Sequence, residues 1–248
     1  MLSNKPAENT DSVSASSHRV YVQVAKEIAT KILTGELKQG EKLPCEHDLK
    51  SKFGISRTSL RECNKLLEAK GLISSKPKVG TSVEVRQQWH FLDPQLLDWI
   101  KDADNVQRFL TQFLGLRKAI EPEACSIAAR SASIEHRKAL SISFQNMKQA
   151  AACHDYAAWT INDHQFHKTI FLATGNPFYI PFANILESLF KTFIDESSTG
   201  GRFCLEEHEA IYDAIMMGDA FRARTSSQLL LNDHNQKLAL VTPSAVTL

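Results

Sequence analysis

The chain has 248 residues, of which 43% are hydrophobic and 23% are charged, and its formal net charge is +1. These values are typical of a soluble globular protein, and no uninterrupted apolar run is long enough to span a membrane. The N-terminus, MLSNKPAENTDSVSASS, lacks the apolar segment of a secretory signal, so we expect residues 1–18 to form a disordered tail. The five cysteines are scattered, odd in number and free of C-x-x-C pairs, which predicts reduced thiols in a cytoplasmic protein with no membrane partner.

The charge is unevenly distributed along the chain. The segment from Arg19 to Arg86 holds 14 Lys and Arg against 8 Asp and Glu, a net charge of +6, whereas residues 87–248 have a net charge of −4. A basic block beside a mildly acidic remainder indicates that only the first block meets a polyanion. On charge alone a solvated basic face is an equally good interpretation, so sequence motifs are needed to distinguish it from a polyanion-binding surface.

Hydrophobic periodicity and turn residues predict five elements in the basic block. They are three helices followed by two short strands: Val20–Leu33, Glu46–Phe53, Arg57–Lys70, Leu72–Ser75 and Thr81–Val85. Ser56 is a good N-cap for the third helix. Three helices followed by a basic hairpin are the layout of a winged helix-turn-helix, which we predict over residues 19–86.

In that fold the third helix enters the major groove of DNA. The residues at its N-terminal end then face base edges or phosphates: Arg57, Thr58 and Arg61. The wing between the strands offers Lys76 and Lys78 to phosphates or to the minor groove, and Gly80 allows a close backbone approach. For any one of these side chains a solvated surface charge is the simpler interpretation, but the arrangement as a whole favours DNA binding.

Ordered motifs run through the same block. They are I-x-x-G-x-L-x-x-G-x-x-L-P at 32–44, G-I-S-R-T-S-L-R-E at 54–62, L-x-x-K-G-L-I at 67–73 and V-G-T-S-V at 79–83. In these motifs the chain resembles the GntR superfamily of bacterial transcription regulators. The resemblance implies that the recognition-helix residues named above contact operator DNA, together with Gly80 and Thr81 of the wing. Where many members have an arginine, this chain has His47, which we expect to alter or weaken a base contact.

Beyond the basic block the sequence is almost entirely helical in pattern. Residues 87–104 form a linker with three aromatic side chains and Pro94, and we expect it to pack against the C-terminal part. Pro122 should kink or split the first helix of that part. The predicted helices form an antiparallel bundle over residues 105–241, a domain for effector binding and dimerisation: Val106–Arg130, Ile134–Cys153, Tyr156–Thr174, Phe178–Ser197, Gly201–Met217 and Ala220–Val241.

One polar pattern stands out in this predicted bundle. Asp163 and His167 are four residues apart, so their side chains share a helix face, and His208 can approach from another helix. Such a set can bind one metal ion. On spacing alone, an Asp/His pair is more often a surface or supporting pair than a metal site.

A second resemblance covers this region, carried by L-x-L-R-K-A-I-E-P-E-A at 114–124, D-x-x-F-H at 163–167, T-G-N-P at 174–177 and E-H-x-A-I-x-x-A-I at 207–215. These motifs resemble the FCD ligand-binding domain of the FadR branch of GntR regulators. The resemblance implies that Asp163, His167 and His208 bind zinc, nickel or a similar divalent ion. It also implies that Arg117 binds a carboxylate effector and that Asn176 adds a hydrogen bond.

The chain departs from the FCD pattern at one ligand. The family's fourth ligand is a histidine 22 residues after the equivalent of His208, and that position is Leu230 here. His234 lies one helical turn further on, so either a shifted helix, a water molecule or the effector itself completes the metal's ligand shell. The segment W-H-F-L-D-P-Q-L-L-D-W at 89–99 is similar to galactonate-type regulators, which implies a sugar acid as effector.

Three functions remain open at this point. The first is a dimeric regulator, acting as a repressor, in which two recognition helices read a palindrome and a carboxylate effector changes operator affinity. The second is a metal-dependent hydrolytic enzyme using the Asp/His/His set, but no H-E-x-x-H motif is present and the basic block would then be unexplained. The third is a metal-free regulator in which His167 and His208 hydrogen-bond the effector. We predict a regulator and no enzymatic activity.

Overall fold

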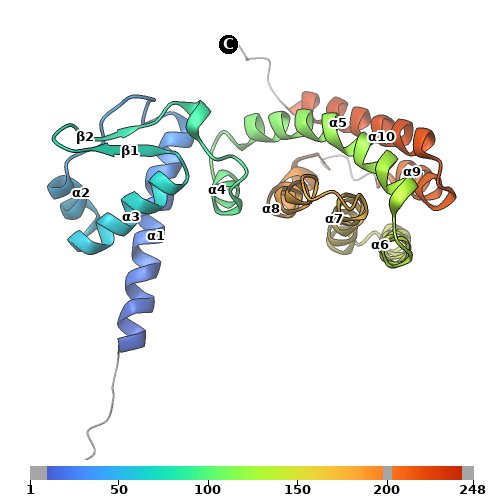
Figure 1. The fold of residues 1–248 in the computed structure, drawn as a ribbon, viewed down its shortest axis with the longest axis horizontal. Helices are drawn as coiled ribbons and strands as arrows, with labels where there is room; N and C mark the ends of the chain where they lie inside the picture. Colours follow the sequence, from blue (N-terminus) through green and yellow to red (C-terminus); the bar gives the residue numbers. More distant parts are fainter. Residues whose placement is uncertain (1–9, 198–202, 242–248) are drawn as a thin grey trace, which may run out of the picture. The chain divides into compact units, whose positions relative to one another are not determined.

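A computed structural model of the chain describes residues 10–197 and 203–241. The chain divides into two compact units, one ending at Asp104 and the other beginning at Asn105. The first unit holds the short two-stranded sheet, and the second is helical throughout its described elements (Figure 1). The predicted fold class, a winged helix-turn-helix followed by an all-helical domain, is confirmed.

The N-terminal unit contains the five elements expected of a winged helix-turn-helix: α1 Thr10–Thr34, α2 Glu46–Phe53, α3 Arg57–Ala69, β1 Ile73–Lys76 and β2 Gly80–Val83. The strands pair antiparallel, with Ile73 opposite Val83 and Lys76 opposite Gly80. Apolar residues of α1 at helical spacing meet those of α3 in the core of the unit, and burial of these side chains holds the three helices together. The buried set is Val24, Ile28, Ile32, Leu60 and Leu67.

The first helix is longer than predicted. It begins at Thr10 rather than at Val20, so residues 10–18, which the sequence analysis assigned to a disordered tail, are helical. A helix already nucleated by a packed segment extends at little further cost, because each added residue contributes a hydrogen bond without a new nucleation step. Residues 1–9 lie outside the described residues.

The segment predicted to be a linker belongs to the compact N-terminal unit. It contains the short 3-10 helix Arg86–Gln88 and helix α4, Pro94–Ile100, which packs on α1. Trp89 and Trp99 are buried there. The side chain of Asp93 caps α4 by accepting a hydrogen bond from the backbone N–H of Leu96, and it also pairs with Lys70 at 2.7 Å.

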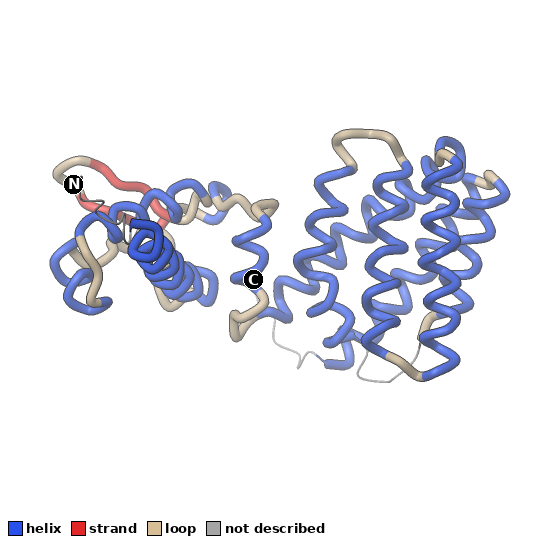
Figure 2. Tube along the Cα trace, turned by 90° about the horizontal axis from the view of Figure 1, so that it is seen from below, coloured by secondary structure: helices blue, strands red, loops and turns tan. Residues whose placement is uncertain are grey.

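The C-terminal unit is a bundle of six helices among the described residues (Figure 2): α5 Val106–Ser131, α6 Ile134–Cys153, α7 Tyr156–Ala173, α8 Ile180–Ser197, α9 Leu205–Met217 and α10 Ala220–Val241. Pro122 does not split α5, because packing of the helix on α10 and α7 outweighs the one backbone hydrogen bond that a proline removes. Helix α9 begins at Leu205, not at Gly201, which is outside the described residues.

Helix α5 packs on both α7 and α9, and this brings together side chains that are distant in the sequence. Arg137 at the start of α6 helps to fix this arrangement. Its guanidinium donates to the carbonyl oxygens of Ala129 at 2.9 Å and Ala132 at 3.3 Å, beside the end of α5, and to that of Ile215 in α9. No helix among the described residues is long and apolar enough to cross a membrane.

Candidate functional site

The N-terminal end of α3 presents an exposed polar face. Ser56 begins the helix, since its hydroxyl accepts a hydrogen bond from the backbone N–H of Ser59 at 3.0 Å. Arg57, Thr58 and Arg61 then point away from the core and are exposed. Arg57 lies 3.6 Å from the carboxylate of Glu46, but both side chains are well exposed, so this pair holds the arginine only weakly.

The wing is a tight turn between β1 and β2. The backbone N–H of Val79 donates to the carbonyl of Lys76 at 3.1 Å, which places Pro77 and Lys78 at the two central positions of the turn. Lys78 has a φ of +65°, unusual for a residue other than glycine, and Gly80 has a φ of +101°. Lys76, Lys78 and Gly80 are exposed.

A groove runs between the wing and the start of α2. Three lysines line it, Lys42, Lys76 and Lys78, together with Asn64 of the recognition helix. Thr81 also lines the groove, half-buried, and its hydroxyl is 3.1 Å from that of Ser75. His47 is exposed on α2. All the residues predicted to contact DNA therefore lie in this one unit, and all but Thr81 are exposed.

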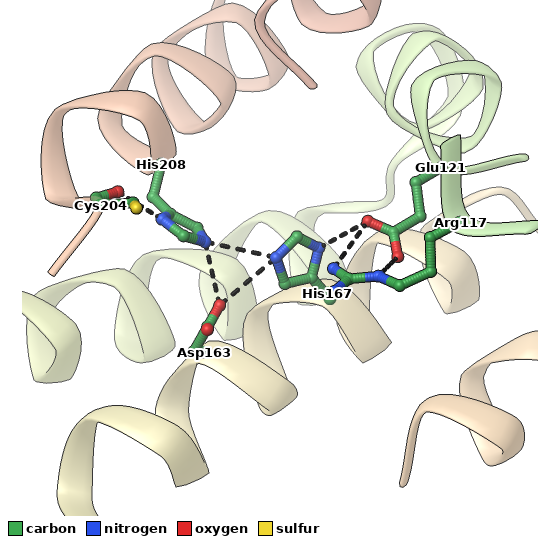
Figure 3. A network of polar contacts seen from close by, with 6 residues as sticks. All are labelled: Arg117, Glu121, Asp163, His167, Cys204 and His208. Atoms are coloured by element: carbon green, nitrogen blue, oxygen red, sulfur yellow. Dashed lines mark hydrogen bonds and ion pairs between the residues drawn. The ribbon is translucent and has the colours of Figure 1, made fainter. Parts of the chain in front are cut away.

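A second group of polar residues is buried inside the C-terminal unit (Figure 3). The side chains of Arg117 and Glu121 come from α5, those of Asp163 and His167 from α7, and that of His208 from α9. Each of these five residues has at most 3% of its surface exposed. Four of them were predicted from the sequence, and Glu121 was not. Its position four residues after Arg117 was the available signal, because that spacing lets the two side chains pair along one helix.

Asp163, His167 and His208 converge on one point. Oδ1 of Asp163 lies 2.9 Å from Nε2 of His208 and 3.3 Å from Nε2 of His167, and the two Nε2 atoms are 3.2 Å apart. All three ligand atoms lie within 4.8 Å of one another. Asp163 and His167 share one face of α7 because they are one turn apart, and His208 comes from α9.

In each of the two histidines, Nδ1 lies next to a hydrogen-bond acceptor and Nε2 faces Asp163. Nδ1 of His208 is 2.5 Å from the carbonyl oxygen of Cys204, and Nδ1 of His167 is 3.1 Å from Oε2 of Glu121. Both oxygens accept hydrogen bonds, so the Nδ1 atoms carry protons and the Nε2 atoms are turned towards Asp163. Oδ1 of Asp163 faces these two Nε2 atoms. Three electron-pair donors facing one point repel one another unless a cation or an added proton lies among them.

The charges of the group are strongly coupled. Burial opposes ionisation of Asp163, but His208 and His167 outweigh it and hold the pKa of Asp163 well below its usual range. Burial likewise opposes ionisation of Glu121, whose pKa is nevertheless lowered to about 2 by Arg117 and His167. Burial lowers the pKa of His167, whereas Glu121 and Asp163 raise it to about 9. The cluster is therefore built to attract positive charge at the point where the three ligand atoms meet.

Both units match described protein families. The family of bacterial regulatory proteins named gntR matches residues 20–83, and the FCD domain matches residues 112–233. An *Escherichia coli* K12 protein named as an uncharacterized HTH-type transcriptional regulator, YieP, is 33% identical over 219 residues, which are 88% of this chain and 95% of the relative. The chain belongs to the GntR family.

Other GntR relatives agree with this assignment. The galactonate operon transcriptional repressor of *Escherichia coli* K12 is 26% identical over 228 residues, which are 90% of this chain and 97% of the relative. Among solved structures, that of *Listeria monocytogenes* Lar has a TM-score of 0.57 and 18% identity over 96% of this chain and all of its own. At that identity the likeness shows the fold alone.

GntR regulators bind operator DNA and small-molecule effectors. The chain is accordingly a transcription regulator and not an enzyme, and nothing in the comparisons supports the hydrolytic alternative. The residues that match the gntR family contain the recognition helix and wing. Those that match the FCD domain contain the buried polar cluster.

The remaining predicted residues are placed as follows. Asn176 belongs to the turn between α7 and α8, where its side-chain oxygen accepts a hydrogen bond from the backbone N–H of Phe178 at 2.9 Å. Leu230 on α10 is completely buried. The side chain of His234 lies outside the described residues. Arg117 is held by Glu121 through two hydrogen bonds, from Nε at 2.5 Å and from a terminal nitrogen at 3.2 Å.

Proposed function

We propose that this GntR regulator is a homodimeric repressor whose operator affinity changes when a small carboxylate binds at a divalent metal centre. The observation that carries the proposal is the meeting of one ligand atom each from Asp163, His167 and His208 at one buried point. Each histidine is held through its opposite nitrogen, as metal-binding histidines usually are. Zinc or nickel suits a set of two imidazoles and one carboxylate.

A three-residue set leaves room for the effector. The apolar Leu230 replaces the fourth ligand found in other FCD domains, so the remaining coordination positions are left to water or to oxygen atoms of a bound acid. A sugar acid offers a carboxylate and a hydroxyl that can bind one ion together. The likeness to a galactonate operon repressor supports this class of effector.

Arg117 is the proposed partner of the effector's carboxylate, and Asn176 a second polar contact. The structure adds a condition to the role of Arg117, because its guanidinium is already paired with Glu121. An effector carboxylate must therefore share the guanidinium with Glu121 or displace it. This condition favours acids that gain additional binding energy from the metal.

The DNA-binding proposal rests on the exposed face of the N-terminal unit. Two copies of α3 in a homodimer would read a short palindrome, with the lysines of the wing on the flanking phosphates. We expect purified protein to prefer its own promoter region over random DNA in fluorescence anisotropy, with an affinity that falls steeply as salt is raised. Equal, salt-insensitive binding to both DNAs would contradict this part of the proposal. Sedimentation equilibrium tests the dimer.

Metal analysis tests the other part. Wild-type protein incubated with Zn²⁺ and then desalted should retain about one ion per chain, and Asp163→Asn should lose it, since the amide replaces a charged ligand. Glu209→Gln is the matched control, because Glu209 lies beside His208 on α9 with an exposed side chain paired to Lys148. Equal metal content in the wild type and the Asp163 variant would favour the metal-free regulator.

A further inference from the structure

Glu121 links the metal-binding cluster to Arg117. It has 1% of its surface exposed, and its two carboxylate oxygens have different partners. Oε1 accepts from Nε of Arg117 at 2.5 Å, whereas Oε2 accepts from a terminal nitrogen of Arg117 at 3.2 Å and lies 3.1 Å from Nδ1 of His167. One oxygen is thus shared by two donors from two helices (Figure 3).

The pairing with Arg117 decides what Glu121 can do for His167. The nitrogen atoms of Arg117 only donate hydrogen bonds, and they donate to both oxygens of Glu121. Both oxygens are therefore acceptors in this arrangement, and Oε2 also faces Nδ1 of His167. Nδ1 of His167 must therefore be the donor, and Nε2 is left to face Asp163 and His208.

We propose that Glu121 is a positioning residue of the metal centre, which holds Nδ1 of His167 so that Nε2 faces the ion, while Arg117 holds the carboxylate in place. This inference rests on the proposed function, since it needs a metal at the cluster. His208 offers a comparison within the same protein, because its Nδ1 is held by the backbone carbonyl of Cys204 and not by a side chain. Loss of Glu121 should disturb one histidine and leave the other unchanged.

The test measures Zn²⁺ affinity by competition with a chromogenic chelator in full-length wild type, Glu121→Gln and Glu123→Gln. Glu123 is a matched control on the same helix, because its side chain is 38% exposed and pairs with Arg224 at the surface. We expect Glu121→Gln to weaken Zn²⁺ binding by about 10- to 100-fold, as loss of a hydrogen-bond partner behind a metal ligand typically does. Glu123→Gln should match the wild type.

A second readout separates positioning from a general structural role. In Zn²⁺-loaded protein with ¹⁵N-labelled histidine, the Nδ1 protons of His167 and His208 should both be observed, and Glu121→Gln should move only that of His167. Unchanged affinity together with an unchanged His167 resonance in that variant would overturn the inference. If the variant does not fold, the wild type still decides, because a proton on Nε2 of Zn²⁺-loaded His167 would overturn it too. Absence of any Zn²⁺ binding by the wild type would instead overturn the proposed function.

Discussion

Gly71 sits where the recognition helix ends and the chain turns into β1. Its φ is +68°, and a Cβ added there would lie 1.9 Å from the carbonyl oxygen of Gln88. Gly54, which has a φ of +62°, has no heavy atom within 4 Å of the same position. We expect Gly54→Ala to lower the free energy of unfolding by about 1 kcal/mol, because alanine disfavours a positive φ and no steric clash is added. Gly71→Ala should cost about 3 kcal/mol or more, because the backbone must also move. Urea unfolding measures both, and equal losses would contradict the close approach.

Lys78 combines a charge for DNA with a backbone conformation that lysine rarely adopts. Lys78→Asn should leave the free energy of unfolding within about 0.5 kcal/mol of the wild type, because asparagine tolerates a positive φ. It should weaken operator binding and reduce the slope of log affinity against log salt by about 0.9, the value for one phosphate contact. Lys138→Gln, at an exposed position on α6, is the control. An unchanged salt slope would show that Lys78 does not contact a phosphate.

Residue types were predictable from the sequence where local geometry decides them. Asp163 and His167 were found because a four-residue spacing becomes proximity on any helix. Ser56 was found because N-caps have a narrow chemistry. The contact of Glu121 with His167 was missed because it comes from α5 packing on α7, a tertiary contact that no local spacing encodes. The pairing of Glu121 with Arg117 is local, and its four-residue spacing was overlooked.

Helix α4 is attached to the N-terminal unit by a buried cation. The Lys70 side chain is 3% exposed, it pairs with Asp93 and lies over the Trp99 ring at 5.1 Å. Asp93→Asn keeps an N-cap for α4 but removes the charge, so it should cost about 1–3 kcal/mol of unfolding free energy. Asp93→Ala removes both the N-cap and the charge, so it should cost about 1 kcal/mol more than Asp93→Asn. Equal losses in chemical unfolding would show that the cap contributes nothing.

The same pair predicts a pH dependence. Burial raises the pKa of Asp93, but hydrogen bonds from Lys70 and from the backbone of Leu96 outweigh it, so the folded-state pKa is below the ordinary value of 3.8. The stabilisation is therefore complete above about pH 5 and is lost as the pH falls through the folded-state pKa. The stability difference between wild type and Asp93→Asn should shrink in this acidic range. A difference that stays constant down to pH 3 would contradict the ion pair.

Arg137 joins α6 to the ends of two other helices. Replacement by Met should cost about 2–3 kcal/mol, because charge-assisted hydrogen bonds to three carbonyl groups are lost. Arg137→Lys should recover only part of this, since an ammonium group cannot reproduce the geometry of the guanidinium. Thermal unfolding of the two variants checks the order, and full recovery by lysine would argue that charge alone matters.

Elements were predicted well where a periodic apolar face extends over several turns, as in α5 to α7. The place of the segment from 87 to 104 in the compact N-terminal unit was not predictable, because its aromatic side chains indicate burial but do not say against which surface. The start of α1 was missed because residues 10–18 have little apolar pattern, and the helix there extends from its packed part.

At the scale of the whole molecule, the gntR match lies in the N-terminal unit and the FCD match in the C-terminal unit. The N-terminal unit gathers exposed positive charge on a recognition helix and a wing, and the C-terminal unit buries a cluster that attracts a cation. A ligand changes operator affinity only if it binds the DNA-competent and the DNA-released states unequally. In the proposed function this inequality arises at a metal ion bound by Asp163, His167 and His208.

The most direct test is operator binding by Zn²⁺-loaded protein in the presence of a panel of sugar acids that includes galactonate. Fluorescence anisotropy should show at least one acid weakening the operator affinity of the wild type about tenfold, which corresponds to a coupling of about 1.4 kcal/mol. The same acid should have no effect on Asp163→Asn, whose operator affinity without acid should match the wild type. A full response to that acid in Asp163→Asn would contradict a metal-centred effector site.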